Sequence, residues 1–560
     1  MPGEDYTGAD LFVDALETYG VTYLFGNPGT TELPLMQAVA NSSLEYVLGL
    51  HEDVAVGMAG GYASVRRYHA HHDPTINPLG VVNLHVAPGL AHGLGNVQNA
   101  AWAGAPILVT AGNHSTDFQH EEPILSGDLV GMVEEYCKLS AEVRDVSAIP
   151  MMVRRAVRTA LTPPTGPVFL GLPMDVMMAE TDNSPSRLGA IPSGGPGDDA
   201  QLAAAVDALE AAEGPVLVLG DQVARAGRDA VDAAVDLAEA TGSAVYSEML
   251  TCEINFPPDH DQWVSFVSPS AEMARAAFDA DALVFVGCTT NTPYIPYDEP
   301  YVPSDATVVQ VGPDSDEVGM NYSADVAVVG DPGAAMAAVA DRATVPEAER
   351  DSRREAIPRR REEAREFLAV EREDRPDGSI SKAALGDALA DIAGDALVVN
   401  ESNTSKYPLV TRWQLRPEQF VSNKNGGLGY SLPATVGAAV ATEEHGDERP
   451  VVGFVSDGSY LYYPQTLYSA ARYDLDLTVV VPDNRNYRIL KDGMLDIYGG
   501  ADEDYEYVGM DFDPAVDLVA NAESHGARGE RVADRADLPG TLSDAIDSDS
   551  PFVVDVLVHD

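Results

Sequence analysis

The sequence predicts an α/β protein with three Rossmann-like, doubly wound parallel-sheet domains. Short apolar runs that end in loops alternate along the chain with segments of helical periodicity. This alternation is typical of βαβ units, in which helices cover a parallel sheet. A segment rich in Pro, Gly and Ser at 181–199 interrupts it and indicates a linker. A charged segment at about 345–376 interrupts it again and has the pattern of a solvated helix and connector.

These interruptions place the three domains at residues 1–182, 200–343 and 377–560. The 560 residues allow three or four domains at roughly 150 residues each. Between the first strands, 31–42 and 52–67 have the pattern of helices. The expected strands fall at 21–29, 79–89, 106–112 and 167–173, then at 215–221, 242–248, 281–287 and 306–312, and finally at 394–402, 449–459, 475–484 and 550–558.

The chain is strongly acidic. It contains 89 Asp and Glu residues against 34 Lys and Arg residues, a formal charge of −55. A nucleic-acid-binding protein would need a basic stripe, and an anionic membrane surface would repel this charge, so both kinds of partner are disfavoured. The acidic residues are spread along the whole chain, a pattern that resembles proteins from salt-loving archaea. Molar salt shortens the Debye length to about 3 Å and screens such a surface.

The cysteines and the start of the chain give no sign of a secreted or membrane protein. Cys137, Cys252 and Cys288 are too far apart for a zinc motif, and their odd number does not suggest a disulfide framework. The first residues lack the basic and apolar pattern of a signal peptide, and no apolar run reaches the roughly 20 residues of a membrane span. We therefore expect a soluble, cytoplasmic protein.

Two neighbouring apolar runs in the third domain end in oxygen-bearing side chains. Asp457 follows the run at 451–455, and Asn484 ends the next run along the chain. An Asp-Gly pair by itself usually marks only a turn. However, successive strands of a parallel sheet deliver their carboxyl ends to one edge, so these two side chains can lie side by side. Their hard oxygen atoms suit Mg²⁺ or Ca²⁺, and Mg²⁺ typically takes one or two carboxylates plus phosphate oxygens.

The acidity of the chain favours a metal-bridged diphosphate at this edge. A helix N-terminus offers only about half a positive charge, worth about 0.3–1 kcal/mol to an anion. The loop around Asp457 contains no Lys or Arg, and the whole chain is negative. We therefore expect a divalent cation, Mg²⁺ or Ca²⁺, to supply the charge that a diphosphate needs.

This pattern resembles the diphosphate-and-metal motif of thiamine-diphosphate enzymes. In that family the motif begins Gly-Asp-Gly and ends Asn-Asn, whereas this chain has Ser456 and Asp483 at the first position of each part. Serine is small enough for the turn, and Asp483 adds an acid beside the metal. The resemblance implies a metal site formed by Asp457, Asn484 and the backbone carbonyl of Asn486. It also implies that the cofactor is bound by Asn403, Thr404, Gly426, Gly427, Leu428, Gly458, Ser459 and Tyr487.

The resemblance further implies a catalytic acid in the first domain. Thiamine activation needs a carboxylic acid beside the aminopyrimidine ring, which takes the proton from the thiazolium carbon. Glu52 holds the matching place, after a strand and before a helix of small residues. An acid that only satisfies the helix dipole is the other interpretation. In the glycine-rich loop, the Gly426 carbonyl would accept from the pyrimidine amino group, and Leu428 would bend the cofactor.

Three motifs resemble one branch of the family, the benzoylformate decarboxylases. The resemblance implies that Thr30 lies near the substrate carboxylate, where the branch has serine, and that His85 is an active-site acid or base. A histidine on an apolar strand is otherwise more often a core residue. The motifs are GNPGTTELP at 26–34, NLHVAPG at 83–89 and NES at 400–402.

Several positions depart from that branch. Ile295, beside Tyr294, stands where the branch has a second active-site histidine, and isoleucine cannot transfer protons. Ile489 replaces a smaller residue, which would narrow an aryl pocket, and Asp492 replaces an aromatic one. The sequence therefore supports the cofactor more firmly than the substrate.

The resemblance implies a non-oxidative decarboxylase of a benzoylformate-like 2-oxo acid. The cofactor ylid would attack the 2-oxo carbon, CO₂ would leave, and protonation of the resulting carbanion would release an aldehyde. An acetolactate synthase-like carboligase, in which the carbanion attacks a second carbonyl, is the alternative, and the missing second histidine favours it. A non-catalytic cofactor-binding paralogue is a third reading, against which Glu52 argues. Because Glu52 and Asp457 lie in different domains, the family implies a homodimer or homotetramer with sites between subunits.

Overall fold

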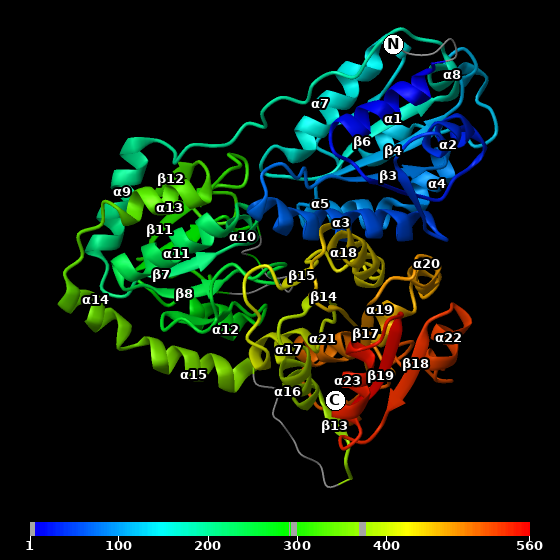
Figure 1. Cartoon of the computed structure of the whole chain (residues 1–560). Helices are drawn as coiled ribbons and strands as arrows, with labels where there is room; N and C mark the ends of the chain where they lie inside the picture. Colours follow the sequence, from blue (N-terminus) through cyan, green and yellow to red (C-terminus); the bar gives the residue numbers. More distant parts are fainter. Residues whose placement is uncertain (1–5, 290–291, 293–298, 369–376, 560) are drawn as a thin grey trace.

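Three parallel sheets covered by helices follow one another along the chain (Figure 1). The structure is a computed structural model that describes residues 6–289, 292, 299–368 and 377–559. The strands within each sheet pair in parallel. In Figure 1 the first sheet lies at the upper right, the second at the left and the third at the lower right. The predicted fold class of three α/β parallel-sheet domains is confirmed.

The first sheet has the strand order β2-β1-β3-β4-β6-β5. The predicted strands and both predicted helices are present, and β2 is the strand that the resemblance implied before Glu52, whereas the edge strand β5 was not predicted. Its strands are β1 (Tyr23–Gly26), β2 (Glu45–Leu48), β3 (Gly80–Leu84), β4 (Ile107–Asn113), β5 (Ser140–Glu142) and β6 (Val168–Pro173). Its helices are α1 (Gly8–Thr18), α2 (Leu33–Ala40), α3 (Glu52–His72), α4 (Val86–His92), α5 (Leu94–Trp102), α6 (Leu129–Val133), α7 (Ile149–Leu161) and α8 (Met174–Met178).

The second sheet has the order β12-β11-β10-β7-β8-β9, so its direction of growth changes between β7 and β10. All four predicted strands are present. Its strands are β7 (Val216–Leu219), β8 (Ala244–Ser247), β9 (Trp263–Phe266), β10 (Ala282–Val286), β11 (Thr307–Gly312) and β12 (Val326–Val329). Its helices are α9 (Asp199–Ala211), α10 (Asp221–Arg225), α11 (Arg228–Thr241), α12 (Ala271–Ala277) and α13 (Pro332–Ala340).

The charged segment after the second sheet forms α14 (Glu347–Arg354) and α15 (Ile357–Leu368), and residues 369–376 lie outside the described residues. Most of its side chains are solvated, as predicted, but Arg353 is buried. The Arg353 guanidinium donates to the carbonyls of Leu209, Thr241 and Ala212 in the second domain. Arg353 therefore fixes the connector to the central domain. Four half-buried arginines of the connector also donate to carbonyls of that domain, namely Arg350, Arg354, Arg360 and Arg361.

The third sheet runs β13-β19-β17-β16-β14-β15, with β18 also paired to β19. Apart from β13, its strands are arranged as in the first sheet. Its strands are β13 (Ile380–Ser381), β14 (Leu397–Glu401), β15 (Phe420–Ser422), β16 (Val451–Val455), β17 (Thr478–Asp483), β18 (Arg528–Val532) and β19 (Phe552–His559). Its helices are α16 (Lys382–Ala393), α17 (Lys406–Arg412), α18 (Ser431–His445), α19 (Asp457–Tyr460), α20 (Thr466–Arg472), α21 (Arg488–Tyr498), α22 (Leu518–Ser524) and α23 (Leu538–Ile546).

Helices α3 and α18 cross in close contact and join the first domain to the third (Figure 1). A Cβ atom at Gly61 would overlap the backbone of Ala434, and one at Gly437 would overlap the carbonyl oxygen of Met58. Glycine is therefore required at both positions, because the backbones approach more closely than any side chain permits. No helix among the described residues is long and apolar enough to cross a bilayer.

Candidate active site

A cavity of about 360 Å³ lies at the carboxyl edge of the third sheet, where the strand order changes direction between β14 and β16. Open α/β sheets bind ligands at such points. Apart from Gly427, the expected cofactor and metal ligands of this domain all line the cavity: Asn403, Thr404, Gly426, Leu428, Asp457, Gly458, Ser459, Asn484, Asn486 and Tyr487.

The carboxylate of Asp457 is buried in this cavity beside a second acid. Its Oδ1 accepts from the Gly458 backbone N–H at 2.9 Å, and its Oδ2 meets no donor among the described residues. Burial and, after it, the neighbouring Asp483 raise the pKa of Asp457 to about 8. Two buried acids with an unsatisfied oxygen call for a positive charge, and oxygen donors suit a hard cation. The site therefore fits Mg²⁺ or Ca²⁺.

A tight turn after β17 brings the second part of the motif to the same cavity. Arg485 adopts a φ of +56°, and its backbone N–H donates to Asp483 Oδ1 at 2.9 Å. Asn486 Nδ2 donates to the Asn484 carbonyl at 2.7 Å. The turn thus holds both asparagines in the cavity wall opposite the start of α19.

Replacing Asp457 by Asn should weaken binding of Mg²⁺ and thiamine diphosphate by at least about 100-fold, because groups that merely orient a metal ligand already contribute 10–100-fold. Calorimetric titration of the purified chain would measure both affinities. Asp483→Asn is the matched control, since it removes the neighbouring charge and spares the proposed ligand. Without metal, Asp457→Asn should also raise the thermal midpoint relative to wild type above pH 8. A buried acid with a raised pKa destabilises the fold progressively as pH rises toward that pKa.

Glu52 is the first residue of α3 and lies against two histidines. The ring of His51 caps the helix, because its Nδ1 accepts from the Asp53 backbone N–H at 3.1 Å. Glu52 Oε2 lies 3.3 Å from His92 Nδ1, and only 12 % of its side chain is exposed. The rings of His51 and His92 stack with centroids 5.3 Å apart, and burial lowers the pKa of His51.

His85 follows β3 and is held by a buried acid. Its Nδ1 lies 2.8 Å from Glu32 Oε2, and Glu32 is only 2 % exposed. Beside an ionised Glu32, which can only accept, a neutral His85 would carry its proton on Nδ1 and leave the other ring nitrogen, Nε2, as an acceptor. The hydroxyl of Thr31, and not that of the exposed Thr30, completes this cluster, at 2.6 Å from Glu32 Oε1.

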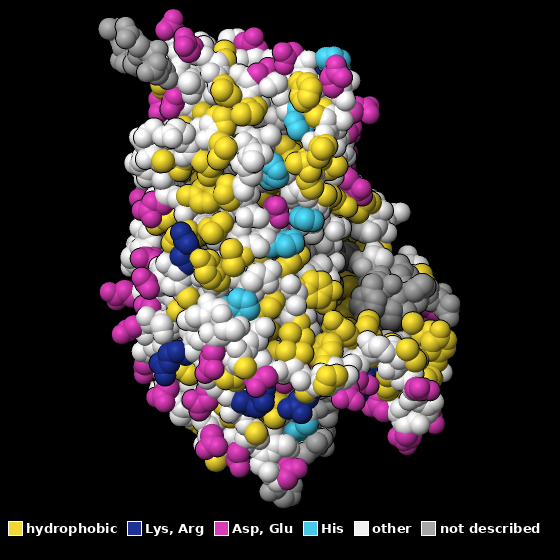
Figure 2. All heavy atoms as spheres, turned by 90° about the vertical axis from the view of Figure 1, so that its right-hand side faces the viewer, with side chains coloured by type: hydrophobic (Ala, Val, Ile, Leu, Met, Phe, Trp, Pro, Cys, Tyr) yellow, Lys and Arg dark blue, Asp and Glu magenta, His cyan; other side chains and the backbone are white. Residues whose placement is uncertain are grey.

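The first-domain residues and the third-domain cavity form separate groups within one chain. Among the described residues, the cavity lining comes only from the segment 403–490. Large apolar side chains are exposed beside both groups, namely Leu50 next to Glu52 and Leu490 and Ile497 on α21. Figure 2 shows a face whose centre carries hydrophobic side chains and histidines, with most acidic side chains toward its margin.

Two of the departing positions are described by the structure. Ile489 lines the cavity and is 36 % exposed. Asp492 forms an ion pair with Arg488 at 2.6 Å, so its charge is matched within α21. Tyr294 and Ile295 lie outside the described residues.

Sequence reasoning missed Glu32 and the two histidines beside Glu52. Glu32 belongs to the motif at 26–34, and its fixed place in that motif was the available signal. Nothing in the local sequence indicates that His92 reaches Glu52, because 40 residues separate them and only the meeting of α3 with α4 brings them together.

All three parts of the chain match thiamine pyrophosphate enzyme families. Residues 6–135 match "Thiamine pyrophosphate enzyme, N-terminal TPP binding domain", residues 202–339 match the central domain, and residues 405–556 match the C-terminal TPP binding domain.

Full-length relatives include decarboxylases and acetolactate synthases. The chain is 30 % identical to the benzoylformate decarboxylase of Pseudomonas aeruginosa, with 97 % of each chain covered. It is 27 % identical to the acetolactate synthase large subunit of Parasynechococcus marenigrum, covering 99 % of this chain and 88 % of that one. The solved structure of the thiamine diphosphate-dependent 4-hydroxybenzoylformate decarboxylase of Rhodococcus jostii superposes with a TM-score of 0.82, at 26 % identity and 99 % coverage of both chains. This chain therefore belongs to the thiamine pyrophosphate enzymes, in the group that contains decarboxylases and acetolactate synthases.

Proposed function

We propose that this protein is a thiamine-diphosphate-dependent decarboxylase of a benzoylformate-like 2-oxo acid. The observation that carries the proposal is the contact between His85 Nδ1 and Glu32 Oε2 at 2.8 Å, which would orient His85 as an acid–base group at the carboxyl edge of the first sheet. The full-length similarity to benzoylformate decarboxylase supports it. The similar identity to an acetolactate synthase keeps carboligation as the second candidate.

The cofactor would be held mainly by the third domain. When bound, thiamine diphosphate supplies a carbon nucleophile and an electron sink for decarboxylation. Asp457, Asn484 and the Asn486 carbonyl would hold Mg²⁺ or Ca²⁺, whose charge would offset the acidic surroundings of the diphosphate. The remaining contacts are assigned to Asn403, Thr404, Gly426, Gly427, Leu428, Gly458, Ser459 and Tyr487.

Glu52 would exchange a proton with the aminopyrimidine of the cofactor. The low exposure of Glu52 and its place at the start of α3 fit a carboxyl group that exchanges protons with the cofactor and is shielded from solvent. The exposed His92, in contact with Glu52, would exchange protons between Glu52 and the solvent. His85 would hold or move a proton at Nε2, since Glu32 fixes the tautomer through Nδ1. Thr30, exposed after β1, would bind the substrate carboxylate.

The site would be completed by a second copy of the chain. The exposed apolar side chains beside Glu52 and on α21 favour an interface that brings the first domain of one subunit to the third domain of another. A homodimer is then the smallest active assembly, and a homotetramer would pair two such dimers.

A product assay in high salt would test the reaction. Protein loaded with magnesium and thiamine diphosphate would be given benzoylformate, phenylpyruvate and pyruvate in turn, and CO₂, aldehyde and acyloin would be followed. We expect CO₂ with aldehyde, most rapidly from an aryl 2-oxo acid. CO₂ with acyloin from pyruvate would instead support the carboligase, and tight cofactor binding without turnover of any 2-oxo acid would support a non-catalytic role.

A further inference from the structure

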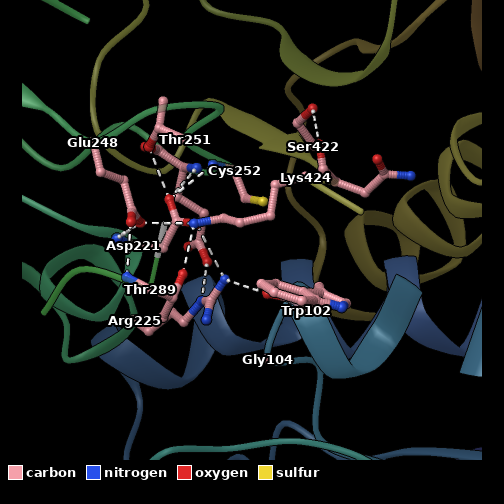
Figure 3. Close-up of polar contacts among 12 residues, drawn as sticks. Trp102, Gly104, Asp221, Arg225, Glu248, Thr251, Cys252, Thr289, Ser422 and Lys424 are labelled. Carbon is pink, nitrogen blue, oxygen red and sulfur yellow. Dashed lines mark hydrogen bonds and ion pairs between the residues drawn. The ribbon is translucent and has the colours of Figure 1, made fainter. Parts of the chain in front are cut away.

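Lys424 is buried in an ion network between domains, two residues before Gly426 (Figure 3). Its side chain has no exposed surface. The ammonium group lies 2.6 Å from Asp221 Oδ2, 2.7 Å from Glu248 Oε1 and 2.8 Å from Thr289 Oγ1. All three donors of the lysine are therefore satisfied, each by a residue of the central domain.

These three acceptors lie where a ligand would be expected in the central domain. Asp221, Glu248 and Thr289 follow β7, β8 and β10, at the carboxyl edge of the second sheet. The strand order changes direction between β7 and β10, and open α/β sheets bind ligands at that point. In this structure the Lys424 side chain from the third domain occupies that point. The carboxyl edge of the central sheet therefore binds the loop at 423–428, here called the cofactor loop.

Further hydrogen bonds hold Asp221, one of the two carboxylates that bind Lys424. Asp221 Oδ1 accepts from the Cys252 backbone N–H at 2.7 Å and from Thr251 Oγ1 at 2.8 Å. The two carboxylates outweigh burial, which alone would lower the pKa of Lys424, and they raise it above its usual range. The ammonium group is therefore charged and tightly held.

The same network reaches the first domain. Arg225 donates to Glu253 Oε1 at 3.1 Å and to the Trp102 carbonyl at 3.2 Å, and Arg67 binds the same oxygen of Glu253 at 2.6 Å. Figure 3 shows Arg225 between Asp221 and the helix that carries Trp102. All three domains thus meet behind the cofactor loop.

The opposite side of the loop is also fixed by the first domain. Asn99 Nδ2 donates to the Gly427 carbonyl at 3.1 Å, and Asn425 Nδ2 donates to Asn99 Oδ1 at 3.0 Å. Gly426, between these contacts, has a φ of +75°, a conformation that favours glycine. Polar contacts on both sides therefore determine where this loop can lie.

Lys424 is one of three buried lysines among the five in the chain, together with Lys382 and Lys406, and it is bound by two carboxylates. Buried ion pairs add little net stability, because desolvation offsets the attraction, and their best-attested use is to specify one arrangement over others. The arrangement specified here is the loop at 423–428 relative to the central domain.

We propose that Lys424 is a positioning residue that fixes the loop at 423–428 on the central domain, so that Gly426 and Leu428 present a preformed surface to the pyrimidine half of thiamine diphosphate. The inference rests on the proposed function, which assigns those two residues to the cofactor. It gives the central domain, whose described residues do not line the cavity, a direct role in cofactor affinity.

Two variants of the full chain test the proposal, with two probes. Lys424→Met removes the ammonium group, and Glu248→Gln keeps the shape of its partner while removing the charge. Calorimetric titration with magnesium and either thiamine diphosphate or inorganic pyrophosphate separates the pyrimidine half from the diphosphate half. Arg353→Met is the matched control, because it removes a buried cation of the connector that binds only backbone carbonyls of the central domain and the Glu349 side chain.

We expect each variant to weaken thiamine diphosphate binding by about tenfold or more. Losses of about 10–100-fold are typical when a residue that orients a binding group, without touching the bound species, is removed. Pyrophosphate binding should stay within about threefold of wild type, and the double variant should lose less than the two single losses combined, because the residues act as one contact. Arg353→Met should lower the thermal midpoint and leave both affinities unchanged.

Equal losses for both probes, or a loss of thiamine diphosphate binding in Arg353→Met as large as in Lys424→Met, would show that Lys424 only stabilises the fold. Unchanged cofactor affinity in a folded Glu248→Gln protein would overturn the proposal as well, even if Lys424→Met could not be purified. Failure of the wild-type chain to bind either probe would instead remove the proposed function, and this inference with it.

Discussion

Replacing Glu52 by Gln should lower turnover by about 10²–10⁴-fold, the usual contribution of a positioned acid or base. Glutamine keeps the size of the side chain at the start of α3 but cannot exchange the proton. Binding of thiamine diphosphate should change little, because the proposed metal and diphosphate ligands all lie in the third domain. Steady-state rates on the best 2-oxo acid and calorimetric cofactor titration would measure the two effects separately.

Glu45→Gln is the control for this variant, since Glu45 is exposed at the start of β2 in the same strand–helix unit. It should leave turnover unchanged. Activity retained by Glu52→Gln would exclude the assigned role. A parallel collapse of cofactor affinity would show that Glu52 shapes the binding site and does not act on protons alone.

Replacing Gly61 by Ala should destabilise the junction of α3 and α18 by about 1–3 kcal/mol, the usual cost of overpacking a filled interior. The new methyl group would overlap backbone atoms of Ala434, which cannot rotate away as a side chain could. Thermal denaturation would show a lowered midpoint, and the loss should appear in both the first and the third domain because the contact joins them.

The neighbouring Gly60 provides the matched control within the same helix. A Cβ atom there meets nothing within 4 Å, so Gly60→Ala should be neutral or raise stability by about 0.5–1 kcal/mol through helix propensity. Equal behaviour of the two variants would contradict the close crossing of α3 and α18.

The sequence predicted the central strands and singled out third-domain residues that line the cavity, because both are encoded locally. β16 and β17 are continuous apolar runs, and Asp457 and Asn484 stand directly at their ends. The edge strand β5 was missed because its three residues are half-exposed, so that no apolar run marks it. Its pairing is decided by the neighbouring strand, which a local pattern does not report.

Contacts between distant segments could not be predicted in the same way. Lys424 and Glu248 are 176 residues apart, and nothing near either one indicates a partner. His85 was predicted from its motif, whereas its orientation depends on Glu32, 53 residues earlier. The motifs thus identified the groups that would face the cofactor, while the fold alone revealed the groups that hold them.

The crossing of α3 and α18 has a mechanical consequence. Helix α3 begins at Glu52, and α18 begins shortly after Leu428. The glycines at their crossing allow the two backbones to lie in direct contact. A rigid, close-packed joint of this kind transmits displacement and does not absorb it. In the homodimer proposed above, this pair of helices would connect the two catalytic centres, so that cofactor binding at one centre would change the affinity of the other.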